Sequence, residues 1–119
     1  MLIYVNKVTV ANLNGRNGAG TSFPVVAGFV NGDILVCDNE LLVDGAYWRR
    51  VRASVRSGAN MPVPANCWAS DSAAGTLQGE LASFDVPSVD LSALSVHGSI
   101  SVDLNGTRYT VLNAEMVKE

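Results

Sequence analysis

The stretch that decides the fold runs from residue 13 to residue 26 and reads LNGRNGAGTSFPVV. It carries three closely spaced glycines, Gly15, Gly18 and Gly20, between two apolar segments. Glycine lacks a Cβ atom, so a chain with this spacing can fold tightly and tolerate positive φ before it returns to extended structure at Phe23. We therefore expect a tight loop that joins two strands of a small β domain.

Segments with the composition of β-strands lie on both sides of this loop. They are rich in β-branched and aromatic residues and occupy residues 3–11, 23–30, 34–40, 47–52 and 67–69. The run at residues 34–37 is apolar throughout, as in a strand that is covered on both faces. Short strands separated by Gly and Asn turns are typical of a small barrel, so we expect an all-β fold.

Dipeptides that favour turns connect these segments. Asn31-Gly32 predicts a type I′ hairpin from Gly28 into residues 33–40, because both central residues of that turn need positive φ. Asp44-Gly45 predicts a further turn. Residues 57–64 are expected to form a loop, because the two prolines in this segment cannot donate to a ladder.

The last third of the chain has a hairpin pattern of its own. Residues 99–104 and 107–112 flank Asn105-Gly106, a strong hairpin signal. Residues 84–94 have the apolar spacing of one or two helical turns. Asn113 stands where the N-cap of a final helical turn would lie.

Length and composition predict one domain with an appendage. The chain has 119 residues, enough for one modest core and short for two. We divide it into a barrel, residues 1–78, and a linker with the β-hairpin, residues 79–119, which packs on the barrel or on a partner. Hydrophobic residues make up 48% and charged residues only 16%, so we expect part of the surface to be covered by other protein, as in a homo-oligomer.

Charge and the N-terminal pattern exclude several classes of partner. The net charge is −3 and the one basic cluster lies at residues 49–56, so no nucleic acid partner is expected. By alternation Arg50 and Arg52 share one solvated strand face and Arg49 points away. The sequence lacks a basic start followed by an apolar h-region and lacks a run of about 18 apolar residues, which predicts neither a signal peptide nor a membrane partner.

The reactive side chains do not form a recognisable catalytic or metal-binding set. Cys37, Cys67 and His97 are widely separated in the sequence, and Cys37 lies inside an apolar strand rather than beside a cation or a helix start. We therefore expect no enzyme, no catalytic residue, no metal and no cofactor. Two reduced, buried thiols are the expected state, with a single bridge between them as the alternative.

Several motifs together resemble the bacterial SH3 family, the SH3b type, over about residues 5–75. The residues that match the family's first motif are Leu13, Asn14, Arg16, Gly18, Gly20, Thr21, Ser22, Phe23, Val25 and Val26. The segments that follow in family order are Asn31-Gly32-Asp33, Tyr47-Trp48-Arg49-Arg50-Val51 and Cys67-Trp68-Ala69-Ser70. Gly15 departs from the pattern, which has a branched apolar residue there, so another group must fill the gap in the core. The resemblance implies a small SH3-like barrel, here with an appended C-terminal β-hairpin.

The resemblance also implies where a ligand would bind. Ligands of the family lie in a groove beside the loop after the first strand, which here involves Arg16, Asn17, Phe23 and Tyr47. Alternation places Tyr47 and Trp48 on opposite faces of their strand, so one packs in the core and the other faces outward.

Two functions follow as expectations. The first is a non-enzymatic assembly protein that docks on other protein subunits and self-associates through an apolar face including residues 95–112, most naturally as a component of a bacteriophage virion. A cytoplasmic adaptor is the alternative setting for the same role. The second is a peptidoglycan-binding module, as is common in the family that the chain resembles.

Overall fold

The computed structural model describes residues 2–71, 80–85, 95–97, 101–104, 107–112 and 115–118. The regular structure of these residues is entirely β-strand, which confirms the all-β class. The strands are β1 (Leu2–Lys7), β2 (Asn12–Arg16), β3 (Val25–Val30), β4 (Ile34–Val43), β5 (Ala46–Arg56), β6 (Ala59–Met61), β7 (Trp68–Asp71), β8 (Glu80–Asp85), β9 (Ser95–His97), β10 (Ser101–Leu104), β11 (Thr107–Leu112) and β12 (Glu115–Lys118).

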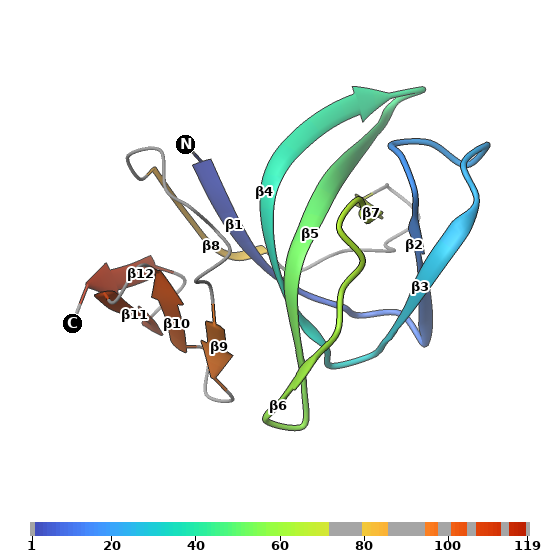
Figure 1. The fold of residues 1–119 in the computed structure, drawn as a ribbon. Coiled ribbons are helices and arrows are strands. Elements are labelled where there is room, and N and C mark those ends of the chain that lie inside the picture. Colours follow the sequence, from blue (N-terminus) through green and yellow to red (C-terminus); the bar gives the residue numbers. More distant parts are fainter. Residues whose placement is uncertain are drawn as a thin grey trace.

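The strands form two antiparallel sheets. The main sheet has the order β3-β2-β7-β5-β4-β1-β8, and β6 pairs with β5 outside this path. It curls around a core, with β3 and β8 at its two ends (Figure 1). Because β3 and β8 do not pair with each other in the described part of the chain, the sheet is not closed. The second sheet has the order β12-β11-β10-β9.

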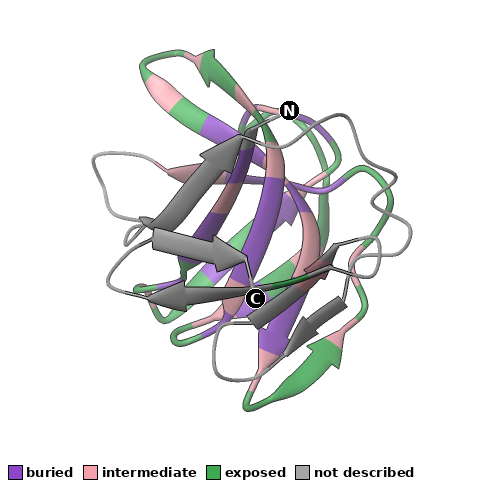
Figure 2. Cartoon of the chain, turned by 90° about the vertical axis from the view of Figure 1, so that its left-hand side faces the viewer, coloured by how far each residue is buried: buried purple, intermediate pink, exposed green. Residues whose placement is uncertain are grey.

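The core of the main sheet lies inside the curl. The buried residues that pack there are Val8, Leu13, Phe29, Leu35, Cys37, Val51, Cys67 and Ala69. They come from segments far apart in sequence, so the curl is held by long-range apolar burial, worth about 25 cal/mol for each Å² removed from water. Figure 2 shows the buried residues along the middle of the central strands and the exposed residues at the hairpin ends.

The opposite face of the central strands is buried as well. Ile3, Val5, Val36 and Val55 are at most 3% exposed, and Val5 pairs with Val36. Strand β9 contacts β5 and β6, and β12 contacts β8. In Figure 1 the second sheet lies on the side of β1, β4 and β5 away from β2 and β3. The prediction that residues 34–37 form a strand covered on both faces is therefore confirmed.

Two hairpins have tight two-residue turns, one at the predicted Asp44-Gly45 and one, at Ser57-Gly58, inside a segment expected to be a loop. Asp44 and Gly45 have φ of 49° and 78°, and Val43 pairs with Ala46, so a two-residue type I′ turn joins β4 to β5. Ser57 and Gly58, with φ of 50° and 80°, join β5 to β6 in the same way. The expected loop at residues 57–64 is thus wrong in its first half, because residues 59–61 form β6, and the prolines lie beyond it.

The predicted type I′ hairpin at Asn31-Gly32 is wrong. Strands β3 and β4 are not ladder partners among the described strands, and only Gly32 has positive φ there, at 94°. The Asp33 amide donates to the Val30 carbonyl at 3.0 Å, and the Gly32 amide donates to the Val8 carbonyl at 2.8 Å. These contacts tie the turn to the end of β1, so the two strands diverge instead of pairing.

The C-terminal strands confirm the predicted hairpin and overturn the predicted helical turn. Strand β10 pairs with β11 in antiparallel register and Leu104 faces Thr107. The Asn105-Gly106 turn and residues 86–94 lie outside the described residues, as does Asn113. Residues 115–118 form β12, which pairs with β11, because the ladder offers more backbone hydrogen bonds than one capped turn. Strand β8, from the predicted appendage, pairs with β1 of the main sheet.

Candidate functional site

The glycine loop begins where Gly15 passes close to the core. A Cβ atom on Gly15 would lie 2.6 Å from Cys67 Sγ, 3.0 Å from Phe29 Cε2 and 3.1 Å from Ala27 Cβ. These side chains occupy the space that a branched residue would fill in the family pattern. The expectation that another group fills the gap is confirmed.

The loop at residues 17–24 is closed by Phe23. The Phe23 ring lies over Gly18, where a Cβ atom would come within 2.5 Å of the ring, and it also covers Gly20. The Arg16 guanidinium donates to the Phe23 carbonyl at 3.0 Å, and the Phe23 amide donates to the Gly20 carbonyl at 3.3 Å. The close approach of an aromatic ring therefore explains the glycine at position 18.

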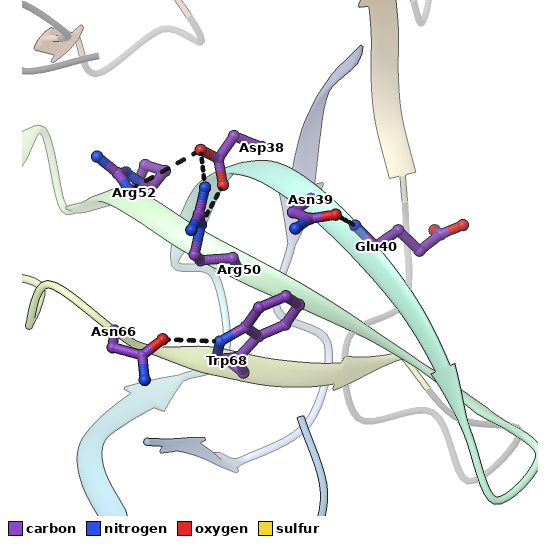
Figure 3. Close-up of polar contacts among 7 residues, drawn as sticks. All are labelled: Asp38, Asn39, Glu40, Arg50, Arg52, Asn66 and Trp68. Carbon is purple, nitrogen blue, oxygen red and sulfur yellow. Dashed lines mark hydrogen bonds and ion pairs between the residues drawn. The ribbon is translucent and has the colours of Figure 1, made fainter. Parts of the chain in front are cut away.

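Asn66 connects this loop to β7. Its side-chain amide donates to the Asn17 carbonyl at 2.9 Å, and its Oδ1 accepts from Trp68 Nε1 at 3.0 Å. Figure 3 shows the Asn66–Trp68 contact. No sequence pattern marks Asn66 as a functional residue, because it is one polar residue in a proline-containing loop. It now defines the position of Asn17, one of the predicted binding residues.

A hollow of about 320 Å³ lies beside the glycine loop. Its lining comes from β2, from residues 20–21 of the loop, from the β4–β5 turn and from β7, and consists of Asn12, Leu13, Asn14, Arg16, Gly20, Thr21, Val43, Asp44, Ala46, Trp48 and Ser70. Arg16 forms no ion pair with a carboxylate of the described residues. The hollow therefore combines a cation, several amide and hydroxyl groups and the edge of a buried tryptophan.

Three of the four predicted binding residues, Arg16, Asn17 and Phe23, lie together at the glycine loop, and the fourth, Tyr47, lies apart on β5. Arg16 lines the hollow, whereas Asn17, Phe23 and Tyr47 do not. Tyr47 is 48% exposed and Trp48 only 4%, which confirms that alternation sends them to opposite faces. A binding role for these residues remains a prediction, divided between the hollow and the exposed surface around it.

Tyr47 belongs to a second surface, the hairpin tip, which we define as Leu41, Leu42 and Tyr47. Their exposed fractions are 45%, 61% and 48%. Leu42 pairs directly with Tyr47 on one face of the β4–β5 hairpin, and Leu41 projects from the other face opposite Trp48. The tip extends beyond the neighbouring strands and is exposed (Figures 1 and 2).

The arginines of β5 are held by carboxylates of β4. Arg50 forms a two-point contact with Asp38 at 2.8 Å for each hydrogen bond, which raises the pKa of Arg50, and Arg52 approaches the same carboxylate at 3.9 Å (Figure 3). The Asp38 side chain is only 3% exposed. Arg49, on the opposite face, donates to Glu40 at 2.9 Å. The shared face of Arg50 and Arg52 is as predicted, but it is organised around a buried anion rather than simply solvated.

Both cysteines are free and buried. Burial raises the pKa of Cys67 to about 11 and raises the pKa of Cys37 further, although the nearby Arg49 opposes the effect at Cys37. Of the two states left open by the sequence, the structure has the reduced thiols. At neutral pH neither sulfur is a thiolate nucleophile.

Within the described residues, no three His, Cys, Asp or Glu side chains gather in a way that could hold a metal ion. In the same part of the chain, no helix is long and apolar enough to cross a membrane. Comparisons of the chain with protein-family models, with curated proteins and with solved structures give no match.

Proposed function

We propose that the protein is a non-enzymatic assembly component that docks on other protein subunits through its hairpin tip. The single observation that carries this proposal is the exposure of three large apolar side chains, Leu41, Leu42 and Tyr47, at the end of a projecting hairpin. Exposed apolar side chains that lie together mark interaction sites in soluble proteins.

The tip has the features of a part that enters a groove on a partner. Apolar side chains project from both of its faces, and the type I′ turn at Asp44 and Gly45 fixes its backbone. A tyrosine has only two side-chain torsions to fix on binding and so loses little conformational entropy, and tyrosine is among the residues enriched in binding hot spots. Of the side chains at residues 95–112, the structure describes only those of Asp103 and Arg108, which pair with each other, so the proposal rests on the tip.

The low charge of the chain and its resemblance to SH3b barrels support an assembly role in a bacteriophage particle. Structural subunits of this kind bury much of their surface against each other, which 16% charged residues would permit. Self-association into a homo-oligomer is the simplest form of such assembly.

Sedimentation velocity over a range of concentrations tests the proposal. We expect wild-type protein to self-associate, and the double variant Leu42→Ser, Tyr47→Ser to associate at least tenfold more weakly because both exposed anchors are lost. Asn60→Ser, an exposed change on β6, is the matched control and should behave as wild type. A wild-type protein that sediments as a monomer at all concentrations would contradict self-association through the tip.

The hollow favours a second function, binding of peptidoglycan. Its amide and hydroxyl groups, the Arg16 cation and the Trp48 edge suit a polar ligand that carries carboxylates. Pull-down on isolated cell walls tests this function with Arg16→Gln, which changes the hollow, and Tyr47→Ser, which changes the tip. Wall binding that is lost in Arg16→Gln and kept in Tyr47→Ser would favour the wall-binding module over assembly.

A further inference from the structure

A second hollow, of about 480 Å³, lies between β3, β5 and the segment at residues 61–64. Residues 26–29 of β3 form one wall, residues 61–64 form the other, and Ser54 and Arg56 of β5 lie between them. We call this hollow the seam. It is separate from both the glycine-loop hollow and the hairpin tip.

Strand β3 is a sheet edge in the part of the chain that the structure describes. Its only ladder partner among the described strands is β2. Val25 and Val26 are 51% and 41% exposed, and no charged residue occurs between positions 17 and 32. Proteins usually protect an edge strand with charges, prolines within the strand or a covering segment, because its unpaired amides and carbonyls accept another strand.

The orientation of β3 directs this edge into the seam. The Gly28 carbonyl accepts a long hydrogen bond, 3.5 Å, from the Arg56 guanidinium of β5. A carbonyl that points toward β5 is not available to β2 on the other side of the strand. The Gly28 amide lies on the same side of the strand as its carbonyl and faces the seam, whereas the Val30 amide donates to Asp33 Oδ2 and the Val30 carbonyl accepts from the Asp33 amide, so an occupant would pair with residues 26–28.

The other wall can supply apolar contact but few hydrogen bonds. Pro62 and Pro64 have no amide hydrogen, and Val63 packs against the core. An occupant would thus pair with β3 and rest its side chains on the proline segment. Residues 26–29 span about 13 Å, the length of four extended residues.

Polar groups in the seam indicate an uncharged occupant. Arg56 is already neutralised by Asp33, through two hydrogen bonds of 3.0 Å. Ser54 is 2% exposed, and its Oγ is buried without a hydrogen-bond partner, although buried hydroxyls normally have one. A backbone amide entering the seam would provide that partner.

We propose that the seam binds an extended, uncharged peptide segment of a partner protein, which adds to β3 as a further strand. This inference rests on the proposed assembly function and names the chemical class of its partner. The ladder with β3 gives affinity, and the alternate side chains of the segment, small or aliphatic, pack against residues 61–64.

The test uses the whole chain and two synthetic hexapeptides. The first is acetyl-Thr-Val-Thr-Val-Thr-Val-amide, and the second carries N-methyl groups on alternate backbone amides, so that one edge of it cannot form a ladder. We expect the first peptide to slow hydrogen exchange of β3 amides at least tenfold and to bind at least tenfold more tightly than the second. Equal binding of the two peptides, or no change in the exchange of β3, would overturn the proposal.

Two variants test whether the peptide binds at the edge of β3 and whether this binding is independent of the hairpin tip. Val26→Lys adds a charge to the edge and should weaken the first peptide at least tenfold, with an unchanged denaturation midpoint as the check on folding. Leu42→Ser should leave peptide binding unchanged. If wild-type protein associates through the tip but does not bind the first peptide, the seam proposal is overturned and the assembly function stands. If wild-type protein binds the first peptide but does not associate through the tip, the assembly function is overturned and peptide binding at the seam stands. Concentration-dependent protection of β3 without peptide would show that a second copy is the occupant, and would overturn the choice of a partner protein.

Discussion

Gly15 gives the most quantitative test of how the glycine loop is built. In Gly15→Ala, the new Cβ atom would lie 2.6 Å from Cys67 Sγ, closer than side-chain atoms pack in folded proteins. Overpacking of this kind costs about 1–3 kcal/mol, and the reduced entropy of the unfolded chain returns about 0.4–1 kcal/mol. We expect a net loss of about 1–2 kcal/mol, or roughly 4–8 °C in Tm for a chain of this size.

A double-mutant cycle with Cys67 isolates the cause. Cys67→Ala alone removes one buried atom and should cost about 1 kcal/mol. In the double variant the new methyl group occupies the space that the sulfur leaves, so the combined loss should fall short of the sum by about 1 kcal/mol or more. Gly28→Ala is the matched control, because nothing lies within 4 Å of its added Cβ atom.

Urea denaturation followed by tryptophan fluorescence measures all four variants, since Trp48 and Trp68 are 4% and 7% exposed and report on the folded core. Additive losses within about 0.4 kcal/mol would refute the argument that Cys67 fills the missing side chain's place. So would a Gly15→Ala variant that is no less stable than Gly28→Ala.

Three further predictions concern the polar contacts and the thiols. Arg50→Gln should lower the free energy of unfolding in urea by about 1–2 kcal/mol, because it leaves the buried Asp38 carboxylate without its two-point partner. Arg52→Gln removes a single contact of 3.9 Å and should cost less than about 0.5 kcal/mol. Equal losses in the two variants would contradict this ranking. Asn66→Ala should cost about 1 kcal/mol and speed hydrogen exchange in residues 17–24, and unchanged exchange would show that the side chain does not hold the loop. Burial raises the pKa of Cys67 to about 11, so the stability from its neutral thiol is present below about pH 9 and is lost as pH rises through about 11. The free energy of unfolding should therefore fall between these two pH values. Ellman's reagent should leave the folded protein unmodified at pH 8.

Local rules predicted the features that depend on a few neighbouring residues. The alternation that buries Trp48 and exposes Tyr47 is a property of any strand, and the type I′ turn at Asp44-Gly45 needs only its two residues. The expectation that other atoms pack where Gly15 has no side chain came from the SH3b motif that the sequence resembles, and Cys67, Phe29 and Ala27 do lie there. The identity of these atoms could not be predicted, because they come from distant segments.

Local rules failed where a distant residue decides the conformation. Asn31-Gly32 has the sequence of a tight hairpin. The next residue, Asp33, forms an ion pair with Arg56, 23 residues away in the sequence, and the turn bonds to the end of β1 instead. Asn66 reaches Asn17 across 49 residues of sequence. The site differs from its prediction for the same reason, since the hollow that Arg16 lines depends on how β2, β7 and the β4–β5 turn come together.

The position of β1 affects how the chain folds during synthesis. Strand β1 lies between β4 and β8, and Ile3 pairs with Phe84, so its second neighbour is made about eighty residues after it. At 5–20 residues per second this delay is roughly 4–16 s, whereas the β4–β5 hairpin can close as soon as it emerges. During this interval the growing chain carries an unpaired apolar edge at β1. We expect the ribosome-bound protein to depend on chaperone protection until β8 has left the exit tunnel.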